Sequence, residues 1–367
     1  MYLLKIHGAG SIGNHIAHAG RRLHWDVTVC DVSDAALQRM REEIYPSRYG
    51  AWDPAIQLVN SAAAPRGGFD VIHIGTPPDV HVALALEALA EAPRAIVVEK
   101  PLCPPSLAGA ADLHARTRAS STKVFVGYDH VVGKAARQVA ALVSEGRIGA
   151  VRTIDVEFRE AWDGILRAHP WLRGPEDTYL GFWERGGGAS GEHSHAANLW
   201  QHFARVGGAG RIVEVDAMLG YGPDGRSAYD DVCLLHVRTE SGLIGRIVQD
   251  AVTRPPLKRA RIQGERGAIE WVGGYTAEAD AVRWLRPDAP EELSVIPKRR
   301  PDDFIQELEH VAAKLEGTDA RDDIGLEAGL DTMLVLAAAH RSQRQRCRVE
   351  IDYNKGYVAD ALRPSRG

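Results

Sequence analysis

The sequence predicts a two-domain α/β protein, in which a doubly wound parallel sheet is followed by a domain built largely from antiparallel strands. Three observations carry this prediction. A glycine-rich turn joins the first strand-like segment to the first helix-like segment. Strand-like and helix-like segments then alternate as far as Tyr128. From Val151 onward, long segments of alternating apolar and polar residues are typical of strands joined by short turns.

The composition is that of an ordinary globular protein. The chain has 367 residues, 45% of them hydrophobic and 25% charged, with a formal net charge of −5. This length predicts two domains, and the charge argues against nucleic acid or a membrane surface as a partner. The four cysteines have no spacing typical of a disulfide framework or metal site. A reducing, cytoplasmic location is the simplest interpretation of these cysteines, and we find neither a signal-peptide pattern nor a stretch long enough to span a bilayer.

The glycine-rich turn has the spacing of a dinucleotide-binding site. It follows a predicted strand from Tyr2 to His7 and precedes a predicted helix that ends at about Leu23. In such a GxGxxG turn, the first glycine permits the bend, the second lets the backbone approach a pyrophosphate, and the third lets helix and strand pack closely. The free N–H groups at the start of the helix favour an anion. We therefore expect the cofactor to contact Gly8, Gly10, Ser11, Ile12 and Gly13.

Asp31 predicts which dinucleotide binds. It closes a second predicted strand, Asp26 to Cys30, and lies 18 residues past Gly13. A carboxylate there can accept hydrogen bonds from the ribose hydroxyls of an adenosine and would repel a 2′-phosphate. NAD is therefore favoured over NADP. The alternative is that Asp31 only caps the helix that begins near Ser33.

Two further strand–helix units carry polar residues where the strands end. Phe69 to Gly75 reads as a buried strand, and Thr76 and Pro77 follow it beside the expected cofactor crevice. His81, in the first turn of the next helix, could pack against the cofactor or be an ordinary helical histidine. No strand can be assigned near residues 46–54.

Ala95 to Val98 reads as a strand buried on both faces, and it stops at Glu99-Lys100-Pro101 because proline donates no ladder hydrogen bond. Glu99 and Lys100 would then stand at the carboxyl end of a central strand, where open α/β sheets bind ligands. A surface ion pair is the alternative. A helix from Ser106 to Ala119 and a strand from Lys123 to Tyr128 complete this domain.

Five segments taken in order resemble one family. They are GAGSIG, the aspartate that closes the second strand, IGTPPDVH, VVEKPL and GYDH. This chain resembles the Gfo/Idh/MocA family (glucose–fructose oxidoreductase and inositol dehydrogenase) over nearly its whole length. The resemblance implies a Rossmann domain followed by an α/β domain with an open, mostly antiparallel sheet, and a homo-oligomer, either dimer or tetramer. It also implies that Lys100 lies near the nicotinamide and binds the reacting hydroxyl. We expect cofactor contacts from Thr76, Pro77, His81, Glu99, Lys100 and Tyr128.

The predicted boundaries follow the change of pattern after His130. We expect a dinucleotide-binding domain over residues 1–130, a substrate-binding and oligomerisation domain over 131–352, and a C-terminal tail over 353–367. The helices within 303–346 are expected to dock on the first domain. A helix from about Lys134 to Glu145 precedes the strands. The predicted strands are Val151 to Glu160, Val213 to Tyr221, Tyr229 to Thr239, Leu243 to Val252, Lys258 to Gly264, Ala268 to Val272 and Val349 to Tyr353.

The stretch Arg185 to His195 carries the remaining candidate chemistry. Its three glycines would let the backbone approach a ligand, and a helix is predicted from there to about Val206. Glu192 and His195 are three residues apart and would share a face of its first turn. Oxidation of an alcohol needs a base for the hydroxyl proton, and histidine suits neutral pH. The family resemblance favours His195 as the base over His193, with Glu192 orienting the substrate or the histidine.

Other interpretations of this stretch are a metal site and a purely structural one. Glu192, His193, His195 and His202 are close in sequence, but adjacent residues on a regular helix point in different directions and could hardly share one ion. We therefore predict no metal. The structural interpretation is a helix cap followed by a buried histidine.

A long polar and aromatic connection, Ala161 to Phe182, precedes the glycines. Long connections of this kind often bind ligands. Arginine, histidine and tryptophan suit a polyhydroxylated or anionic substrate, so we expect contacts from Arg167, His169 and Trp171. Together with Lys100, Tyr128, Glu192, His193 and His195 they form the predicted substrate site. The alternative is a structural loop packed by its own tryptophans.

These predictions converge on an NAD-dependent dehydrogenase. The expected reaction is hydride transfer between the nicotinamide and a secondary hydroxyl of a sugar, sugar derivative or cyclitol. Lys100, His195 and Glu192 are the expected catalytic residues. Two alternatives stay open: a glycosidase of the same fold that recycles its NAD, and a non-catalytic protein that has kept the fold. The sequence does not identify the substrate.

Overall fold

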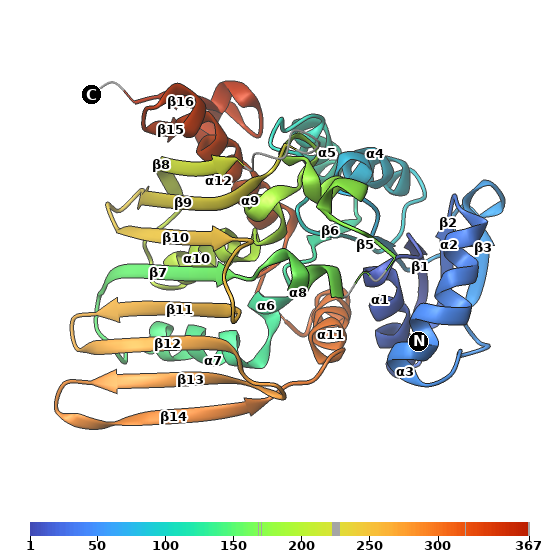
Figure 1. Ribbon diagram of the computed structural model, residues 1–367, viewed down its shortest axis with the longest axis horizontal. Helices are drawn as coiled ribbons and strands as arrows, with labels where there is room; N and C mark the ends of the chain where they lie inside the picture. Colours follow the sequence, from blue (N-terminus) through green and yellow to red (C-terminus); the bar gives the residue numbers. More distant parts are fainter. Residues whose placement is uncertain (168, 170, 222–227, 320, 366–367) are drawn as a thin grey trace.

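The computed structural model describes residues 1–367 except 168, 170, 222–227, 320, 366 and 367. Its two sheets lie side by side (Figure 1). The six-stranded sheet is formed by the first part of the chain, and the ten-stranded sheet by the remainder. The predicted fold class is confirmed.

The six-stranded sheet is parallel throughout, in the order β3-β2-β1-β4-β5-β6. Consecutive strands move outward from β1 in both directions, so the order reverses between β1 and β4. The carboxyl ends of these two strands therefore flank the crevice where doubly wound sheets bind ligands. Its strands are β1 (Leu3–His7), β2 (Asp26–Asp31), β3 (Gln57–Asn60), β4 (Val71–Ile74), β5 (Ala95–Val98) and β6 (Lys123–Val126).

Several helices of this part differ from their predicted bounds. The helix α4 begins at Pro78, directly after the Thr76-Pro77 turn, because proline is well suited to the first helical turn, and His81 lies in that turn as predicted. The helix α5 begins at Ala110 and not at Ser106. The strand that could not be assigned is β3, beyond a short helical stretch. The helical elements are α1 (Ser11–Arg22), α2 (Asp34–Arg39), a π-helix η1 (Met40–Ile44), α3 (Tyr45–Tyr49), α4 (Pro78–Leu89), α5 (Ala110–Arg118) and α6 (Asp129–Val132).

The ten-stranded sheet has the order β14-β13-β12-β11-β7-β10-β9-β8-β15-β16. It is antiparallel except where β7 and β10 run parallel, so the predicted mostly antiparallel sheet is confirmed. Its strands are β7 (Val151–Arg159), β8 (Ile212–Tyr221), β9 (Asp230–Thr239), β10 (Ile244–Asp250), β11 (Leu257–Gly264), β12 (Gly267–Thr276), β13 (Ala279–Arg286), β14 (Ala289–Pro297), β15 (Val349–Ile351) and β16 (Leu362–Pro364).

Three of these strands were not predicted. The strand β14 contains Pro290 and Pro297 and is largely exposed, as an edge strand can be, so its sequence lacks the apolar alternation of a half-buried strand. The strand β13 lies between it and β12. At the other edge, β16 pairs with β15, so the last residues before Ser365 belong to the sheet and are not a loose tail.

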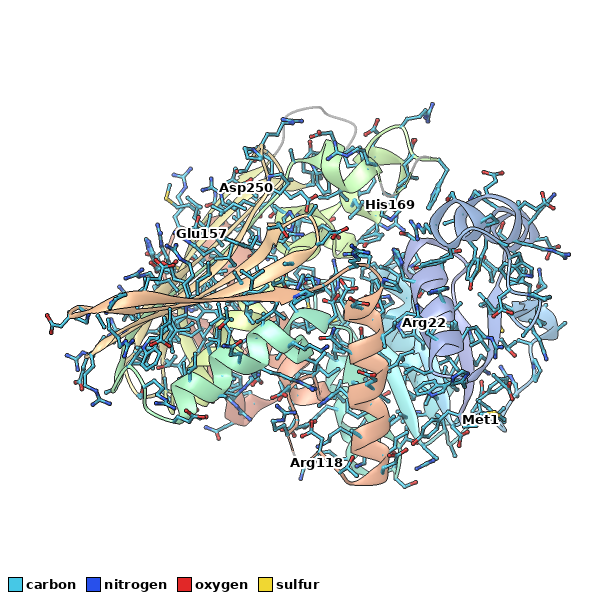
Figure 2. The ribbon with its side chains drawn as sticks, turned by 90° about the horizontal axis from the view of Figure 1, so that it is seen from below. Met1, Arg22, Arg118, Glu157, His169 and Asp250 are labelled. Carbon is cyan, nitrogen blue, oxygen red and sulfur yellow. The ribbon has the colours of Figure 1, made fainter. Side chains whose placement is uncertain are left out.

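Helices cover one face of this sheet and leave the other open (Figure 2). The covering helices are α7 (Lys134–Ser144), α10 (His195–Val206) and α12 (Leu326–Gln345), which pack against β12, β7 and β8 respectively. Trp200 of α10 is fully buried and donates a hydrogen bond to the Ile154 carbonyl at 2.8 Å. The helix α11 (Asp302–Glu316) packs against α1 and α6 and so joins the two parts. None of the helices described has the length and apolar character needed to cross a membrane.

Candidate active site

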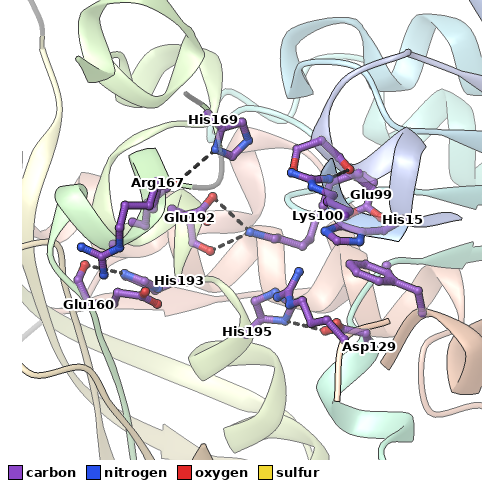
Figure 3. A pocket seen from close by; sticks show the side chains of 18 of the residues that line it. His15, Glu99, Lys100, Asp129, Glu160, Arg167, His169, Glu192, His193 and His195 are labelled. Atoms are coloured by element: carbon purple, nitrogen blue, oxygen red, sulfur yellow. Dashed lines mark hydrogen bonds and ion pairs between the residues drawn. The ribbon is translucent and has the colours of Figure 1, made fainter. Parts of the chain in front are cut away.

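A cavity of about 810 Å³ lies between the two sheets. One wall comes from α1, η1, α3 and the segments after β5 and β6. The other comes from β7, the loop after it, the α9–α10 segment and α11. Of the predicted site residues, the cavity collects Ser11, Ile12, Glu99, Lys100, Arg167, His169, Trp171, Glu192, His193 and His195 (Figure 3).

The glycine turn at the start of α1 fits a dinucleotide. A Cβ atom at Gly13 would lie 1.9 Å from the Gly8 carbonyl oxygen, and one at Gly8 would lie 2.6 Å from the Gly75 carbonyl oxygen. A Cβ at Gly10 would meet nothing within 4 Å. The outer glycines are therefore required for packing, while the middle one faces open space. No side chain caps α1, which leaves its first N–H groups for an anion.

Asp31 lies beside this turn. Its carboxylate accepts hydrogen bonds from the Ala9 N–H at 2.8 Å and the Ser33 N–H at 2.9 Å. The alternative that Asp31 caps the following helix is wrong, because Ser33 is the cap of α2 and accepts from the Ala36 N–H through its Oγ. Each carboxylate oxygen keeps a lone pair for a further donor.

Thr76, Pro77 and His81 do not line the cavity. The His81 ring is fully buried, with its two nitrogens 2.6 Å from the Thr76 carbonyl oxygen and 3.0 Å from the Pro101 carbonyl oxygen. Burial lowers the pKa of this imidazole. His81 therefore ties the turn after β4 to the turn after β5 that carries Lys100.

Lys100 and Glu192 form the central ion pair. The Lys100 Nζ atom donates to the Glu192 carboxylate at 3.1 Å and to the Glu192 carbonyl oxygen at 2.9 Å. The two side chains are only 13% and 20% exposed, so this pair is largely shielded from water. Although burial opposes ionisation of Glu192, the ammonium of Lys100 holds the pKa of its carboxyl below the usual value. This pair joins the end of β5 to the opposite wall of the cavity.

A second pair, formed by His195 and Asp129, lies below the first in Figure 3. His195 Nδ1 is 3.7 Å from Asp129 Oδ1, and both atoms are buried without a hydrogen-bond partner among the described residues. Burial lowers the pKa of His195 well below its usual value, which keeps the ring neutral. Burial, and then Asp303, raise the pKa of the Asp129 carboxyl to about 7.

Glu192 and His195 do not share a helical face, which corrects the prediction. Glu192 ends a short helix, α9 (Gly188–Glu192), and His195 begins α10. The chain changes direction at His193, so Glu192 points to Lys100 and His195 points to Asp129. His193 also lines the cavity, and its Nε2 is 3.4 Å from the Glu160 carbonyl oxygen. Burial lowers the pKa of His193 to about 4.

The glycines at the start of α9, Gly187 and Gly188, do not have the predicted role of admitting a ligand. A Cβ at Gly187 would lie 2.0 Å from the Tyr179 carbonyl oxygen, and one at Gly188 would lie 2.0 Å from Asp230 Oδ1. They therefore allow close packing within the protein, and not the approach of a ligand. Asp230 also accepts from the Ser190 N–H at 2.7 Å and the Ser190 hydroxyl at 2.9 Å, which fixes the helix that carries Glu192.

The loop after β7 forms the outer wall of the cavity. It contains a short helix, α8 (Trp162–Arg167), which was predicted as irregular. Arg167 pairs with Asp163 at 3.1 Å and is 70% exposed, so its guanidinium can turn toward a ligand. The Trp171 ring lies under the guanidinium of Arg39, 5.2 Å away, which joins this loop to α2 across the cavity. Residues 168 and 170 of the predicted loop lie outside the described residues.

Tyr128 is not on the cavity surface. It is fully buried, and its ring edge contacts His195 at a centroid distance of 5.6 Å. Its place is therefore behind the histidine. The His195 ring is also flanked by His130 at 4.6 Å and by Phe158 at 6.0 Å. These three rings fix its orientation.

Two clusters in the described part of the chain have the donor atoms to hold a metal ion. They are Asp129 with His130 and His195, and His73 with Glu99 and Glu307. Around the first, Lys298, Lys258, Arg300 and Lys100 all lower the pKa of His130, after burial, and the same positive charges oppose a cation. In the second, burial raises the pKa of Glu307 well above its usual value, so a proton can neutralise it. His202, a possible metal ligand from the sequence, belongs to neither cluster, and its Nδ1 lies 3.8 Å from Asp323 Oδ1.

Sequence reasoning missed several cavity residues. Asp129 and His130 follow directly after Tyr128, in the segment GYDH, and could have been found as polar residues at a strand's carboxyl end. Lys258 pairs with Glu160 at 3.1 Å across two neighbouring strands. Other cavity residues that the sequence did not indicate are His15, Arg48, Phe158, Arg300 and Phe304. They come from strand ends and helices whose meeting depends on how the two parts pack.

Comparison with protein families identifies the chain. Residues 4–128 match the family described as "Oxidoreductase family, NAD-binding Rossmann fold". Residues 136–270 match the GFO/IDH/MocA C-terminal domain. The chain therefore belongs to the Gfo/Idh/MocA family, as its motifs predicted. A comparison with curated protein sequences finds no match.

Solved structures share the fold over the whole length. An oxidoreductase from Agrobacterium radiobacter, in complex with NAD+, L-tartaric acid and magnesium, is 19% identical with a TM-score of 0.75, covering 95% of this chain and 98% of that one. The WlbA dehydrogenase from Bordetella pertussis, in complex with NADH and UDP-GlcNAcA, is 21% identical with a TM-score of 0.72 (95% and 97% covered). An inositol dehydrogenase homolog from Azotobacter vinelandii, complexed with NADH and myo-inositol, is 17% identical with a TM-score of 0.69 (95% and 97% covered).

The family and the Rossmann domain define the general class of this protein. It is an NAD(P)-dependent oxidoreductase with a nucleotide-binding first domain. Its own substrate is a separate question.

Proposed function

We propose that this protein oxidises, reversibly, a secondary hydroxyl of a sugar, sugar derivative or cyclitol with NAD as hydride acceptor. The observation that carries the proposal is the meeting of Lys100, Glu192 and His195 in one cavity that also includes the start of α1. Glu192 and His195 are close in sequence, but Lys100 is 92 residues from Glu192, so its meeting with them is a property of the fold. The ligands of the similar structures, NADH with myo-inositol and NAD+ with tartaric acid, are consistent with it.

The proposed chemistry divides between the two pairs. Lys100 donates a hydrogen bond to the reacting oxygen and stabilises the negative charge that develops there. His195, neutral because it is buried, accepts the hydroxyl proton. Glu192 holds the Lys100 ammonium in place and orients the substrate. The family resemblance favours His195 over His193 as the base; the Glu160 carbonyl oxygen near His193 Nε2 favours the form of His193 with hydrogen on that nitrogen.

The proposed cofactor is NAD, with NADP disfavoured. The pyrophosphate would lie over Gly10 and the first N–H groups of α1, including those of Ser11 and Ile12. The ribose hydroxyls would donate to the free lone pairs of Asp31, where a 2′-phosphate would be repelled. When bound, NAD supplies the hydride acceptor. His81, together with Thr76 and Pro77, would support this wall from behind by holding the Lys100 turn.

The substrate wall is proposed to be the loop after β7. Arg167, His169 and Trp171 line the cavity, and in Figure 3 His193 lies below Arg167 and His169. Their donors and ring faces suit a polyhydroxylated compound. This wall therefore decides which hydroxyl faces Lys100.

We further propose that the protein forms a homo-oligomer in the cytoplasm, a dimer or tetramer, through the open face of the ten-stranded sheet. Met218, Ile244 and Val295 on this face are 73%, 54% and 50% exposed, which is high for large apolar side chains. Light scattering coupled to size-exclusion chromatography of the purified protein measures the state. A mass of one chain, about 40 kDa, would contradict this part.

The experiment for the catalytic proposal is a rate assay of NAD+ reduction by absorbance at 340 nm. The purified protein is assayed with a panel of aldoses, sugar acids, amino sugars and inositols. We expect turnover with at least one member and NAD+, and much slower turnover with NADP+. Equal rates with both cofactors would contradict the assignment of Asp31. Turnover restricted to primary alcohols or aldehydes would contradict the substrate class.

A further inference from the structure

Asp129 is the one carboxylate of the cavity whose buried oxygen faces the base. Its Oδ1 atom lies 3.7 Å from His195 Nδ1, nearer than His130 Nε2 at 4.0 Å, and neither Asp129 Oδ1 nor His195 Nδ1 has a hydrogen-bond partner within the described residues. This separation exceeds a normal hydrogen bond, but such contacts are often long before substrate binds and tighten in the complex. Leaving both atoms unpaired would cost stability unless they serve each other. The geometry therefore pairs Asp129 with His195.

The contact selects one tautomer of the histidine. A neutral imidazole has one N–H donor and one acceptor nitrogen, whereas a carboxylate only accepts. An ionised Asp129 therefore stabilises the form with hydrogen on Nδ1. That form leaves Nε2 as the acceptor, and Nε2 is neither buried nor hydrogen-bonded in the described part of the structure. The nitrogen that is open to the cavity is thus the one able to take a proton.

Glu192 cannot select the tautomer of His195. It is held by Lys100, at 2.9 Å through its carbonyl oxygen and 3.1 Å through its carboxylate. The break between α9 and α10 also turns its side chain away from His195. The two acids of the cavity are therefore divided: one serves the lysine and the other faces the histidine.

We propose that Asp129 is the positioning residue of His195, fixing the ring as the Nδ1–H tautomer so that Nε2 accepts the substrate proton. This inference rests on the proposed function and extends it to a residue from the first domain. Asp129 is the first residue of α6, an element that α11 contacts, so the base is aligned only when the two parts of the chain are packed together.

The proposal has a consequence for pH. Asp129 feels Asp303 and Glu99, which favour its neutral form, and Arg300 and Lys298, which favour its ionised form. Glu307 on α11 also interacts with it. His195 is surrounded by His130, Lys100, Lys258 and His193, all of which favour its neutral form. With burial raising the pKa of Asp129 to about 7, turnover should rise with pH through neutrality, because the protonated acid selects the wrong tautomer.

The tautomer can be measured without a substrate. Two-dimensional ¹⁵N NMR of the histidine rings distinguishes Nδ1–H from Nε2–H, and the spectrum of His195→Gln assigns the signal of His195. We expect Nδ1–H in the wild-type holoenzyme with NAD+ at pH 8, and a shift toward Nε2–H at pH 5.5. Nε2–H at pH 8 in the wild type would overturn the proposal, and this readout does not depend on any variant of Asp129.

Turnover provides the second arm, with Asp129→Asn as the variant. We expect kcat to fall by roughly 10²- to 10⁴-fold with little change in KM, since the amide no longer enforces the tautomer. The rise near pH 7 should disappear, and Asp129→Glu should restore part of it. The matched control, Asp303→Asn, should keep the rise and move it to lower pH, because it removes a negative charge near Asp129.

The two arms separate failure of this inference from failure of the proposed function. If Asp129→Asn retains kcat and its pH rise while the wild type turns over a hydroxyl substrate, the positioning role is wrong and the dehydrogenase stands. If the wild type oxidises nothing, the NMR result still decides the pairing of Asp129 with His195.

Discussion

The open face of the ten-stranded sheet and the cavity between the two sheets are both rich in charge, but they hold it differently. On the open face, charges alternate across neighbouring strands: Arg238 with Glu214 at 2.9 Å, Arg259 with Glu157 at 2.9 Å, and Arg261 with Glu270 at 2.7 Å. The arginines are 37% to 46% exposed. Glu214 is 23% exposed, so water screens its pair with Arg238 and this pair adds little stability. Glu157 and Glu270 are only 8% and 6% exposed, and each pairs with at least two arginines.

In the cavity, several titratable groups are buried and lack hydrogen-bond partners among the described residues. Asp129 and His195 each keep an unpaired buried atom, and both have displaced pKa values. Groups held in this way reduce stability, and they cluster where chemistry needs them. On the sheet the charges are paired across strands, whereas Asp129 in the cavity is a buried acid whose Oδ1 atom has no hydrogen-bond partner among the described residues. Four substitutions test this difference.

Lys100→Ala should have one of the two largest effects on turnover, together with Asp129→Asn. Removing the donor to the reacting oxygen should reduce kcat about 10²- to 10³-fold. The affinity for NADH should change little, because the nucleotide is held mainly by the turn at α1. Lys123→Ala, at the opposite end of the same sheet, is the matched control and should leave kcat unchanged. Retained turnover in Lys100→Ala would remove the lysine from the mechanism.

Asp129→Asn should raise stability while it lowers turnover. The folded protein raises the pKa of Asp129 from 3.8 to about 7, so it holds this proton more tightly than the unfolded chain does. The stability contributed by the protonated group is complete below about pH 4 and is lost as the pH rises toward 7. At pH 8 the variant should therefore be more stable, by about 1–4 kcal/mol.

Urea unfolding of the wild type and Asp129→Asn at pH 5 and pH 8 measures the difference in their free energies of unfolding. The advantage of the variant should be larger at pH 8. An equal difference at both pH values would show that Asp129 does not carry a buried charge.

Glu192→Gln should have an intermediate effect on turnover. The Lys100 ammonium would lose its charged partner but keep the Glu192 carbonyl oxygen, so we expect kcat to fall about 10- to 100-fold. Glu184→Gln, on the exposed part of the same segment, is the control. Steady-state rates with the best panel substrate decide the result, and a kcat equal to wild type would mean that the pair only closes the cavity.

Arg238→Ala, on the open face, should have the smallest effect. Its partner Glu214 is also reached by Arg348 at 3.4 Å, so the loss of one pair is buffered. We expect a loss of at most about 1 kcal/mol in the free energy of unfolding, measured in urea. Turnover should be unchanged. A larger loss of unfolding free energy would mean that the charge pairs on the open face act as a cooperative unit. The proposed contrast with the cavity would then weaken.

The sequence predicts well what is decided locally. The strand β5 has the predicted bounds, Ala95–Val98, because four apolar residues between an arginine and Glu99-Lys100-Pro101 leave few alternatives. The glycine turn is likewise where its motif places it. The strand β14 was missed because an exposed edge with two prolines has no apolar alternation to detect.

The candidate site was predicted by residue type better than by geometry. Glu192 and His195 were found, but not the break at His193 that separates their directions. The segment GYDH contains Asp129, but the sequence does not indicate a role for this residue, because its partner His195 is 66 residues away along the chain. Such pairings depend on how two domains pack, and no local pattern encodes them. The glycines at 186–188 were assigned to a ligand because a sequence cannot show what a missing Cβ would touch.

The most direct test of the central claim is a titration of the purified protein with NADH and with NADPH, followed by quenching of tryptophan fluorescence. The account predicts that NADH binds more tightly than NADPH, and that Gly10→Ala weakens NADH binding without lowering stability, because its Cβ would enter the open space meant for the cofactor. Absence of binding by either nucleotide, after any co-purified nucleotide has been removed, would contradict the account.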